Sequence, residues 1–488
     1  MPTLKTLTLG CKVNQYETEY VRQGLLRLGY REATDGEPVD LCIVNTCTVT
    51  ATAEAKSRKA IRQLARQNPR AEIIVMGCYA TQAADEVAAL PSEGHGTCPS
   101  EWAGVVEVVT DKRQLPELLS RLGLVDPPTG ISSFGSRHRA YVKVQDGCRM
   151  PCSYCIIPTV RPVLVSRPVG EVLDEIRRLV SHGHREIVLT GIHLGHYGVD
   201  LAGGVSDGVD LVGGVSDGIA PEGGVSDGVD PVGGVSDADC GRRLQWHPDR
   251  SPTESPPTLD LARLVRRIVE LEGEFRLRIS SIEAAEVTPE LIALLAERPD
   301  RVCPHLHLSM QSGSDRVLRR MRRRWPAGQF VECCRQIRRS LDQPALTTDV
   351  IVGFPGETQE DFAATCRVVE EVGFSRLHVF RFSPRRGTPA ADMPDQVPEA
   401  VKQRRAAELT ELGERLRRRY FEGLAGRKLQ VLVETPAGSC PGLLLGTSDR
   451  YTPVELAGDR ELIGRLVTVT AGPVVAGRIR AAEAPHIH

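Results

Sequence analysis

The chain has 488 residues, a length typical of about three domains. It is 41% hydrophobic and 25% charged, as expected for a soluble globular protein, and no apolar run approaches the roughly 18 residues of a membrane-spanning helix. The N-terminus lacks the apolar segment of a secretory signal, so we expect a cytoplasmic protein without a membrane partner. In that reducing compartment the 14 cysteines are better explained as metal ligands or buried thiols than as disulfides.

Residues 1–120 alternate strand and helix patterns, which predicts an N-terminal parallel α/β sheet domain. Three predicted strands, at 4–9, 41–46 and 73–76, each end just before a cysteine, namely Cys11, Cys47 and Cys78. Ligands of parallel sheets bind beyond the carboxyl ends of the strands. We therefore expect these three cysteines to converge at one edge of the sheet.

A Pro- and Ser-containing linker is predicted at 121–139, followed by a second α/β domain at 140–395. Helical patterns separate six predicted strands, which favours a partial (β/α)6 barrel with its chemistry at the carboxyl ends of the strands. The six strands are predicted at 141–145, 186–190, 276–281, 305–310, 348–352 and 378–382.

An insertion at about 200–257 interrupts this second domain. Residues 203–240 contain eight acidic residues and no Lys or Arg, whereas the formal charge of the whole chain is −2, so the rest of the protein is mildly basic. A decapeptide repeat starts at Gly203, Gly213, Gly223 and Gly233. Its Gly and Asp content leaves little to bury, which predicts a disordered acidic loop directed away from the rest of the molecule. A plain insertion is favoured over calcium-binding repeats, because those have a nonapeptide period.

The C-terminal part of the chain has two predicted pieces. Residues 396–427 form a basic helical connector rich in Arg and Glu. Residues 428–482 contain short alternating apolar segments split by Gly and Pro, which predicts a small all-β barrel. Barrels of this size often bind nucleic acids, and the basic connector beside it favours an RNA partner.

The sharpest motif is a CxxxCxxC sequence formed by Cys148, Cys152 and Cys155, just after a predicted strand. Three thiolates within eight residues can surround one face of a metal centre. Zinc usually takes four protein ligands, and this loop contains no fourth Cys or His, so a zinc knuckle is the less favoured reading. A [4Fe–4S] cluster held by three cysteines keeps one iron open, and that iron can bind S-adenosylmethionine and reduce it.

This motif on a (β/α) barrel resembles the radical-SAM superfamily, and other motifs resemble its methylthiotransferase branch. The first of these, GCKVNQYE at 10–17, is most similar to enzymes that modify N6-threonylcarbamoyladenosine in tRNA. Further matching motifs, in chain order, are NTCTVT at 45–50, GCYA at 77–80, QDGC at 145–148, TGIHLG at 190–195, SSIE at 280–283, SMQSGSD at 309–315, TDVIVGFPGET at 348–358 and FSPRRGT at 382–388. The C-terminal β segment resembles the TRAM domain of that family. Pro162 and Val165 depart from the family's usual residues.

The resemblance implies two [4Fe–4S] clusters and S-adenosylmethionine as cofactors. Cys148, Cys152 and Cys155 would hold the radical-generating cluster. Cys11, Cys47 and Cys78 would hold an auxiliary cluster where the incoming sulfur binds. The implied reaction places a methylthio group on C2 of N6-threonylcarbamoyladenosine next to the anticodon. It requires tRNA, an external electron donor and a sulfur source as partners.

Other candidate residues lie at strand ends or in basic runs. Cofactor or substrate contacts are predicted at Thr190, Gly191, Glu283, Gln311, Gly353, Gly356 and Glu357. RNA contacts are predicted at Arg319, Arg322, Arg323, Arg417, Arg418 and Lys428. No catalytic side chain is predicted beyond the cluster ligands, and the histidines of these motifs are interpreted as buried or solvated rather than as ligands.

Two alternatives remain open on the sequence. The first keeps the chemistry and changes the substrate to isopentenyl-adenosine in tRNA or to an aspartate of a ribosomal protein. The second is a non-catalytic RNA-binding protein in which metal centres only stabilise the fold.

Overall fold

The computed structural model describes residues 1–488 except 91–105, 136, 202–259, 439–441, 484 and 488. The decapeptide repeat, and with it the prediction of an outward-directed acidic loop, lies outside the described residues. Met1–Asp200 and Leu259–His488 form one compact unit. Within the described residues, no helix is both long and apolar enough to cross a membrane.

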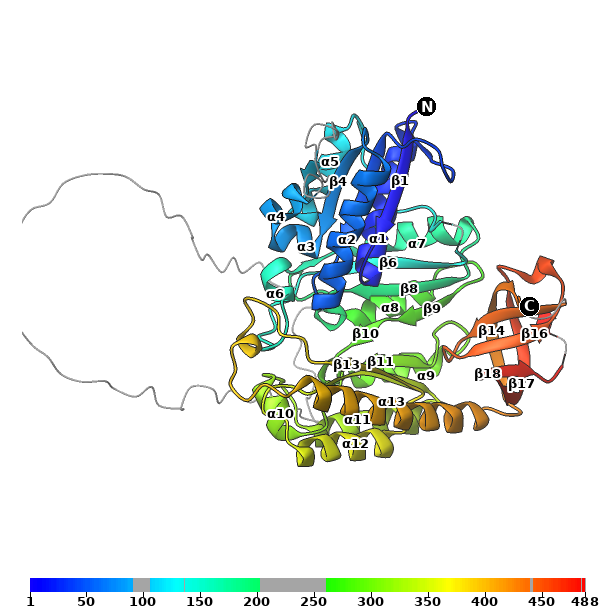
Figure 1. Ribbon diagram of the computed structural model, residues 1–488. Helices are drawn as coiled ribbons and strands as arrows, with labels where there is room; N and C mark the ends of the chain where they lie inside the picture. Colours follow the sequence, from blue (N-terminus) through cyan, green and yellow to red (C-terminus); the bar gives the residue numbers. More distant parts are fainter. Residues whose placement is uncertain (91–105, 136, 202–259, 439–441, 484, 488) are drawn as a thin grey trace, which may run out of the picture. The chain divides into compact units, whose positions relative to one another are not determined.

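The N-terminal part of the chain, blue in Figure 1, folds around a parallel sheet with the strand order β2-β1-β3-β4-β5. Its strands are β1 Thr3–Thr8, β2 Arg31–Glu32, β3 Leu41–Thr46, β4 Glu72–Gly77 and β5 Val106–Val108. Its helices are α1 Lys12–Arg27, α2 Ala51–Gln67, α3 Cys78–Gln82, α4 Ala84–Ala89 and α5 Leu115–Arg121. All six residues of β3 are buried, as expected for a central strand that helices cover on both faces.

Two four-stranded sheets follow, in the orders β7-β6-β8-β9 and β10-β11-β12-β13. Their strands are β6 Arg139–Asp146, β7 Val165–Ser166, β8 Glu186–Gly191, β9 Arg276–Ile279, β10 Ser281–Ile282, β11 His305–Leu308, β12 Ala345–Val352 and β13 Arg376–Arg381. The intervening helices are α6 Ile157–Val160, α7 Val169–Ser181, α8 Leu261–Val269, α9 Pro289–Glu297, α10 Asp315–Arg320, α11 Ala327–Ser340 and α12 Gln359–Val372. Apart from the short antiparallel β7, the strands pair in parallel, so the predicted α/β architecture is confirmed.

The third predicted strand of this region differs from the expectation of one strand at 276–281. The chain leaves β9 at Ile279 and enters β10 at Ser281, and the two short strands belong to different sheets. The two sheets still meet at this point. Leu277 of β9 forms a β-bridge with Val302, and β9 lies next to β11 of the other sheet. The break therefore divides the barrel wall into two sheets.

The chain then forms the long helix α13 Glu399–Glu422 and a small β-barrel. The strands are β14 Lys428–Pro436, β15 Leu443–Ser448, β16 Pro453–Ala457, β17 Leu466–Val475, β18 Arg478–Ala481 and β19 His486–Ile487. The sheet closes because β14 pairs with both β15 and β17. Its interior is a separate apolar core that includes Val431, Val454 and Val469. The predicted all-β barrel is confirmed.

One continuous apolar core joins the N-terminal sheet to the central barrel. It runs from Leu4 of β1 and Leu25 of α1 through Val142 of β6 to Leu306 and Val350 of the second barrel sheet. Because these side chains pack in one cluster, the carboxyl edge of the first sheet is held in a defined place against the barrel.

Candidate functional site

Cys11, Cys47 and Cys78 lie together at the carboxyl edge of the N-terminal sheet. Cys11 occupies the N-cap position of α1, and its side chain makes no capping hydrogen bond. Cys78 is the first residue of α3, directly after β4. A β-carbon built on Gly10 would lie 3.0 Å from Cβ of Cys47 and 3.3 Å from its Sγ, so the loop before Cys11 passes directly over Cys47. The predicted convergence of the three cysteines is observed.

The chemistry of this trio suits an iron–sulfur cluster. All three are free cysteines. Burial raises the pKa of Cys47 to about 11, and the neighbouring Cys78 and Cys11 thiols push it in the same direction. The N-terminus of α1 favours negative charge at Cys11. Three converging thiols beside such a helix end are the donor set of a cluster with three cysteine ligands.

Cys148, Cys152 and Cys155 form a second trio in the loop after β6. Cys155 N–H donates to the Cys152 carbonyl at 3.1 Å, and Met150 N–H donates to Sγ of Cys148 at 3.5 Å. Burial raises the pKa of Cys148 to about 11 and that of Cys155 to about 12. The loop needs glycine at position 147, where φ is +80° and a β-carbon would lie 1.8 Å from the Val163 carbonyl oxygen. This loop has the donor chemistry for a second cluster.

The short helix α6 brings the two trios side by side. Cys78 of the first trio packs against Ile156, Val160 and Ile157. Ile157 also packs against the apolar cluster that contains Cys148 and Cys152. Both groups of thiols therefore pack against the same short helix.

Arg161, at the end of α6, ties both trios to one network. Its backbone carbonyl accepts from Cys148 N–H at 3.0 Å. Its guanidinium donates to Glu17 at 2.8 Å and to Asp146 at 2.8 Å, and reaches Asn14 at 3.3 Å. Burial alone would raise the pKa of Glu17, but Arg161 and then Lys143 outweigh it and hold that pKa below its ordinary value.

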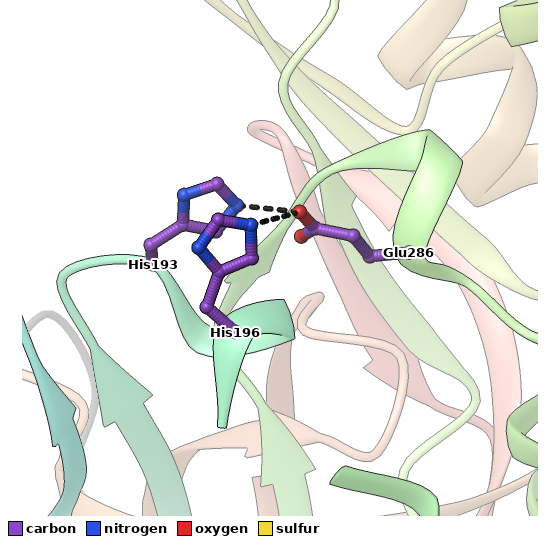
Figure 2. A group of neighbouring side chains, drawn as sticks. All are labelled: His193, His196 and Glu286. Atoms are coloured by element: carbon purple, nitrogen blue, oxygen red, sulfur yellow. Dashed lines mark hydrogen bonds and ion pairs between the residues drawn. The ribbon is translucent and has the colours of Figure 1, made fainter. Parts of the chain in front are cut away.

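A histidine pair supports the second trio from the barrel side. Figure 2 shows His193 and His196 lying over one another, with both rings directed at Glu286. The ring centroids are 3.7 Å apart, and Glu286 Oε1 lies 2.6 Å from His193 Nε2 and 3.3 Å from His196 Nε2. His193 Nδ1 lies 3.4 Å from Sγ of Cys148. Arg324 places a guanidinium 3.3 Å from the same Glu286 oxygen, which favours hydrogen-bonded support of Cys148 over a separate cation site.

His193 also shapes the strand ends around it. Gln145 Oε1 accepts from His193 N–H at 2.8 Å, and a β-carbon on Gly191 would lie 3.0 Å from that same Gln145 oxygen. Thr190, predicted as a cofactor contact, is buried at the end of β8. Sequence reasoning missed the contact of His193 with Cys148, although His193 lies within the TGIHLG motif that it had singled out.

Arg323 is buried beside the second trio. Its side chain is only 2% exposed, pairs with Glu283, and reaches Ser309 O at 3.0 Å and Sγ of Cys152 at 3.6 Å. Burial raises the pKa of Glu283, although Arg323 opposes that shift. The predicted RNA contact at Arg323 does not fit this burial, because its guanidinium is turned toward the cysteine loop.

Comparisons with known proteins agree with this geometry. A family model described as the uncharacterized protein family UPF0004 matches residues 3–95, and one described as the radical SAM superfamily matches residues 250–369. A threonylcarbamoyladenosine tRNA methylthiotransferase from Bacillus subtilis is 35% identical over 96% of this chain and 93% of its own length. The chain belongs to the radical-SAM methylthiotransferase family.

Two further relatives are named for different modified adenosines. A threonylcarbamoyladenosine tRNA methylthiotransferase from Chlamydia pneumoniae is 37% identical over 89% of this methylthiotransferase and 88% of its own length. A tRNA-2-methylthio-N(6)-dimethylallyladenosine synthase from Corynebacterium diphtheriae is 33% identical, over 88% and 75% respectively. Membership of the radical SAM superfamily brings S-adenosylmethionine and a [4Fe–4S] cluster as cofactors.

The residues of the GFPGET motif of the methylthiotransferase mainly contact other parts of the protein. Glu357 is buried, and one of its oxygens accepts from Gly353 N–H at 2.6 Å and from Arg405 at 2.7 Å. A β-carbon on Gly353 would lie 2.3 Å from Lys402 of α13, and one on Gly356 would lie 3.1 Å from Arg320. These contacts tie the loop to α13 and α10. A cofactor contact at Gly353, Gly356 or Glu357 stays a prediction.

Gln311 stands apart from that loop. Its φ is +66°, a conformation that non-glycine residues seldom adopt, and its backbone bridges to Val350 of β12. The strained backbone orients Gln311 next to the barrel wall, where a substrate contact stays a prediction.

The remaining basic candidates of the methylthiotransferase lie at its surface. Arg319 and Arg322 near α10 are exposed, as are Arg418 of α13 and Lys428 at the start of β14. Arg417 is half-buried, pairs with Glu414 at 2.6 Å and lies over the ring of Phe421. The four are exposed and can meet a phosphate, whereas Arg417 is already partly engaged.

Proposed function

We propose that this methylthiotransferase places a methylthio group on C2 of N6-threonylcarbamoyladenosine, next to the anticodon of tRNA. The two relatives that carry this activity in their names support the choice of nucleoside. The observation that carries the proposal is the adjacency of two cysteine trios across α6. A reaction that removes hydrogen from one carbon and delivers sulfur to it needs both functions within reach of the same base.

Each trio has a distinct proposed role. Cys148, Cys152 and Cys155 would hold the radical-SAM cluster, and Cys11, Cys47 and Cys78 would hold an auxiliary cluster. With S-adenosylmethionine bound, these cofactors supply the one-electron and group-transfer chemistry that side chains cannot perform on an aromatic C–H bond.

The chain's own residues would position these cofactors and exclude water. Arg161, which directly follows α6, pairs with Glu17 of α1 at 2.8 Å and so ties the helix between the trios to the helix that begins after Cys11. Thr190, Gly191 and Glu283 line the strand ends beside the second trio and are proposed cofactor contacts. Arg418 and Lys428, which are exposed, would meet tRNA phosphates. The electron donor and the sulfur source are external partners.

Anaerobic reconstitution tests the proposal. The wild-type chain should produce 5′-deoxyadenosine from S-adenosylmethionine and reductant, and nucleoside mass spectrometry should find the methylthio product on tRNA that contains threonylcarbamoyladenosine. A triple Cys11, Cys47 and Cys78 to Ala variant should lose about half of the iron, because each trio would hold its own cluster.

The control is Cys366→Ala, since Cys366 is a free cysteine of α12 outside both trios. It should keep the wild-type iron content. A zinc-only protein, or one that makes no 5′-deoxyadenosine, would favour the non-catalytic alternative. A product formed only on isopentenyl-adenosine, or on a ribosomal protein, would reject the proposed substrate.

A further inference from the structure

The interior of the central barrel contains a cavity of about 360 Å³. Strands of both barrel sheets line it, and the C-terminal barrel contributes Tyr451. The N-terminal domain contributes Lys12, the first residue of α1 and the neighbour of Cys11. Three parts of the chain therefore line the cavity, and one of the lining residues directly follows Cys11.

The charges deep in this cavity already have partners. Glu186 pairs with Arg139 at 2.7 Å and with Arg278 at 2.8 Å. Both guanidinium groups also lie over the ring of Tyr451, at 5.5 and 4.9 Å from its centroid. These side chains close the cavity on the side of the C-terminal barrel and are not available to a ligand.

His307 and Asp349, which also line the cavity, form a second pair of interacting side chains. His307 Nε2 lies 3.3 Å from Asp349 Oδ1, and Nδ1 of the same ring lies 3.0 Å from Thr347 Oγ1. His378 stands beside this pair, and the ligand atoms of His307, Asp349 and His378 all lie within 4.8 Å of one another. His307 is thus the hydrogen-bond partner of Asp349. Burial works to raise the pKa of that carboxyl group, but His307 and the nearby His378 and Lys12 lower it.

Among the described residues that line the cavity, Lys12, His378 and the exposed Arg376 at the start of β13 are left without a partner. Among the described residues, neither the Lys12 ammonium nor the His378 imidazole makes a hydrogen bond or ion pair that holds it. Phe380, on the same strand as His378, also lines the cavity and is 44% exposed, which is unusual for an aromatic side chain. A cation, a hydrogen-bonding imidazole and an uncovered aromatic face thus point into one space.

We propose that this space binds the N6 substituent of the nucleoside, with Lys12 as the ion-pair partner of its carboxylate and His378 as a hydrogen-bond partner. The inference rests on the proposed function and deepens it, because it names what selects the substrate. A threonylcarbamoyl group carries a carboxylate and a hydroxyl, whereas a dimethylallyl group is wholly apolar. An apolar group would leave Lys12 and His378 desolvated without partners, a cost that polar sites use to reject such analogues. The ring of Phe380 would stack on the base.

The test compares three anticodon stem-loop RNAs that differ only at the target adenosine, which is unmodified, threonylcarbamoylated or isopentenylated. Binding to the anaerobically reconstituted full chain is measured at one salt concentration. Wild type should prefer the threonylcarbamoylated RNA. Lys12→Met should reduce that preference about tenfold to a hundredfold, which corresponds to the usual free energy of a hydrogen bond to a charged group. Lys12→Arg should restore part of it.

The ratio between RNAs is the deciding measurement, because loss of one positive charge weakens all three RNAs through their shared phosphates. Lys5→Met is the matched control, since Lys5 is exposed on β1 and does not line the cavity. It should leave the ratio at the wild-type value. Iron per chain is measured for each variant. If Lys12→Met loses iron, His378→Phe decides, because His378 lies on β13 and is not next to a cysteine of either trio in the sequence.

Failure of the inference can be told apart from failure of the proposed function. If wild type modifies and prefers the threonylcarbamoylated RNA while Lys12→Met and His378→Phe keep that preference, the cavity assignment is overturned and the function stands. If wild type methylthiolates only the isopentenylated RNA, both are overturned.

Discussion

His193 links Cys148 of the second trio to the barrel wall, as Arg323 does for Cys152. Its Nδ1 faces Sγ of Cys148 at 3.4 Å, and its Nε2 is held by Glu286 at 2.6 Å. Residues that orient metal ligands in this way usually contribute substantially to metal binding, because they fix the ligand's direction and tune its charge.

We expect His193→Phe to lower metal affinity or turnover about tenfold to a hundredfold, the usual effect of removing a residue that supports a metal ligand. The measurements are iron per chain and the rate of 5′-deoxyadenosine formation under anaerobic conditions. His196→Phe is the matched control, because His196 stacks on His193 and shares Glu286 with it. Equal defects in both variants would contradict a specific role for the contact with Cys148.

At the scale of elements, the loop after β6 depends on one backbone conformation. Gly147 has a φ of +80°, and a β-carbon there would meet the Val163 carbonyl oxygen at 1.8 Å. No side chain can be accommodated unless the segment after α6 moves away from the cysteines.

Gly147→Ala should therefore disorder the cysteine loop, and reconstituted protein should lose about half of its iron if each trio holds one cluster. Gly170→Ala makes the same chemical change in α7, where a β-carbon would meet nothing within 4 Å. That control should retain its iron and be slightly more stable, since alanine restricts the unfolded chain more than glycine does. Full iron content in Gly147→Ala would contradict the argument.

The segment between the N-terminal domain and the barrel is held by a titratable contact. Phe134 N–H donates to His184 Nε2 at 3.1 Å, which requires an unprotonated nitrogen. Burial is the main reason that the pKa of His184 lies at about 4, below its ordinary value of 6.5. The contribution of this contact to stability is therefore complete above pH 6.5 and is lost as the pH falls through about 4, because the unfolded chain takes up the proton first.

His184→Gln can accept the same hydrogen bond without titrating. We expect wild type to be more stable at pH 7.5 and the difference in melting temperature between the two proteins to shrink or reverse by pH 5. Thermal unfolding of both proteins across that range measures this. A difference that is constant with pH would contradict the assignment.

At the scale of the whole molecule, one carboxylate connects the barrel to the C-terminal β-barrel. Glu186 is fully buried and pairs with Arg276 at 2.5 Å and Arg278 at 2.8 Å. These two guanidinium groups donate in turn to backbone carbonyls of the C-terminal barrel, at Gln430, Thr447, Ser448 and Asp449. Removing the charge of Glu186 leaves buried cations without their counterion.

Glu186→Gln should cost about 3–5 kcal/mol, and the C-terminal barrel should separate in a transition of its own at lower temperature. Differential scanning calorimetry measures both effects. The control is Glu274→Gln, because Glu274 is 40% exposed and pairs with Arg185 at 3.5 Å, and it should cost no more than about 1 kcal/mol. A single unshifted transition in Glu186→Gln would show that the two barrels are joined by other contacts.

Much of the architecture follows from local patterns in the sequence. The strands that end before Cys11 and Cys47 are predicted almost to the residue, because their apolar runs are short and end at polar residues. The CxxxCxxC loop is equally local, since three cysteines within eight residues need no long-range packing to lie together. The closed C-terminal barrel follows from alternating apolar residues.

What the sequence by itself determined about this methylthiotransferase is therefore its fold class, its family and the two groups of cysteines. Tertiary structure alone decided that α6 joins the trios, that Arg323 turns inward, and that Lys12 and His378 face the same cavity. The physical reason is sequence separation. Lys12 lies in α1 and His378 in β13, far apart along the chain, and the continuous apolar core that packs the first sheet on the barrel brings them together.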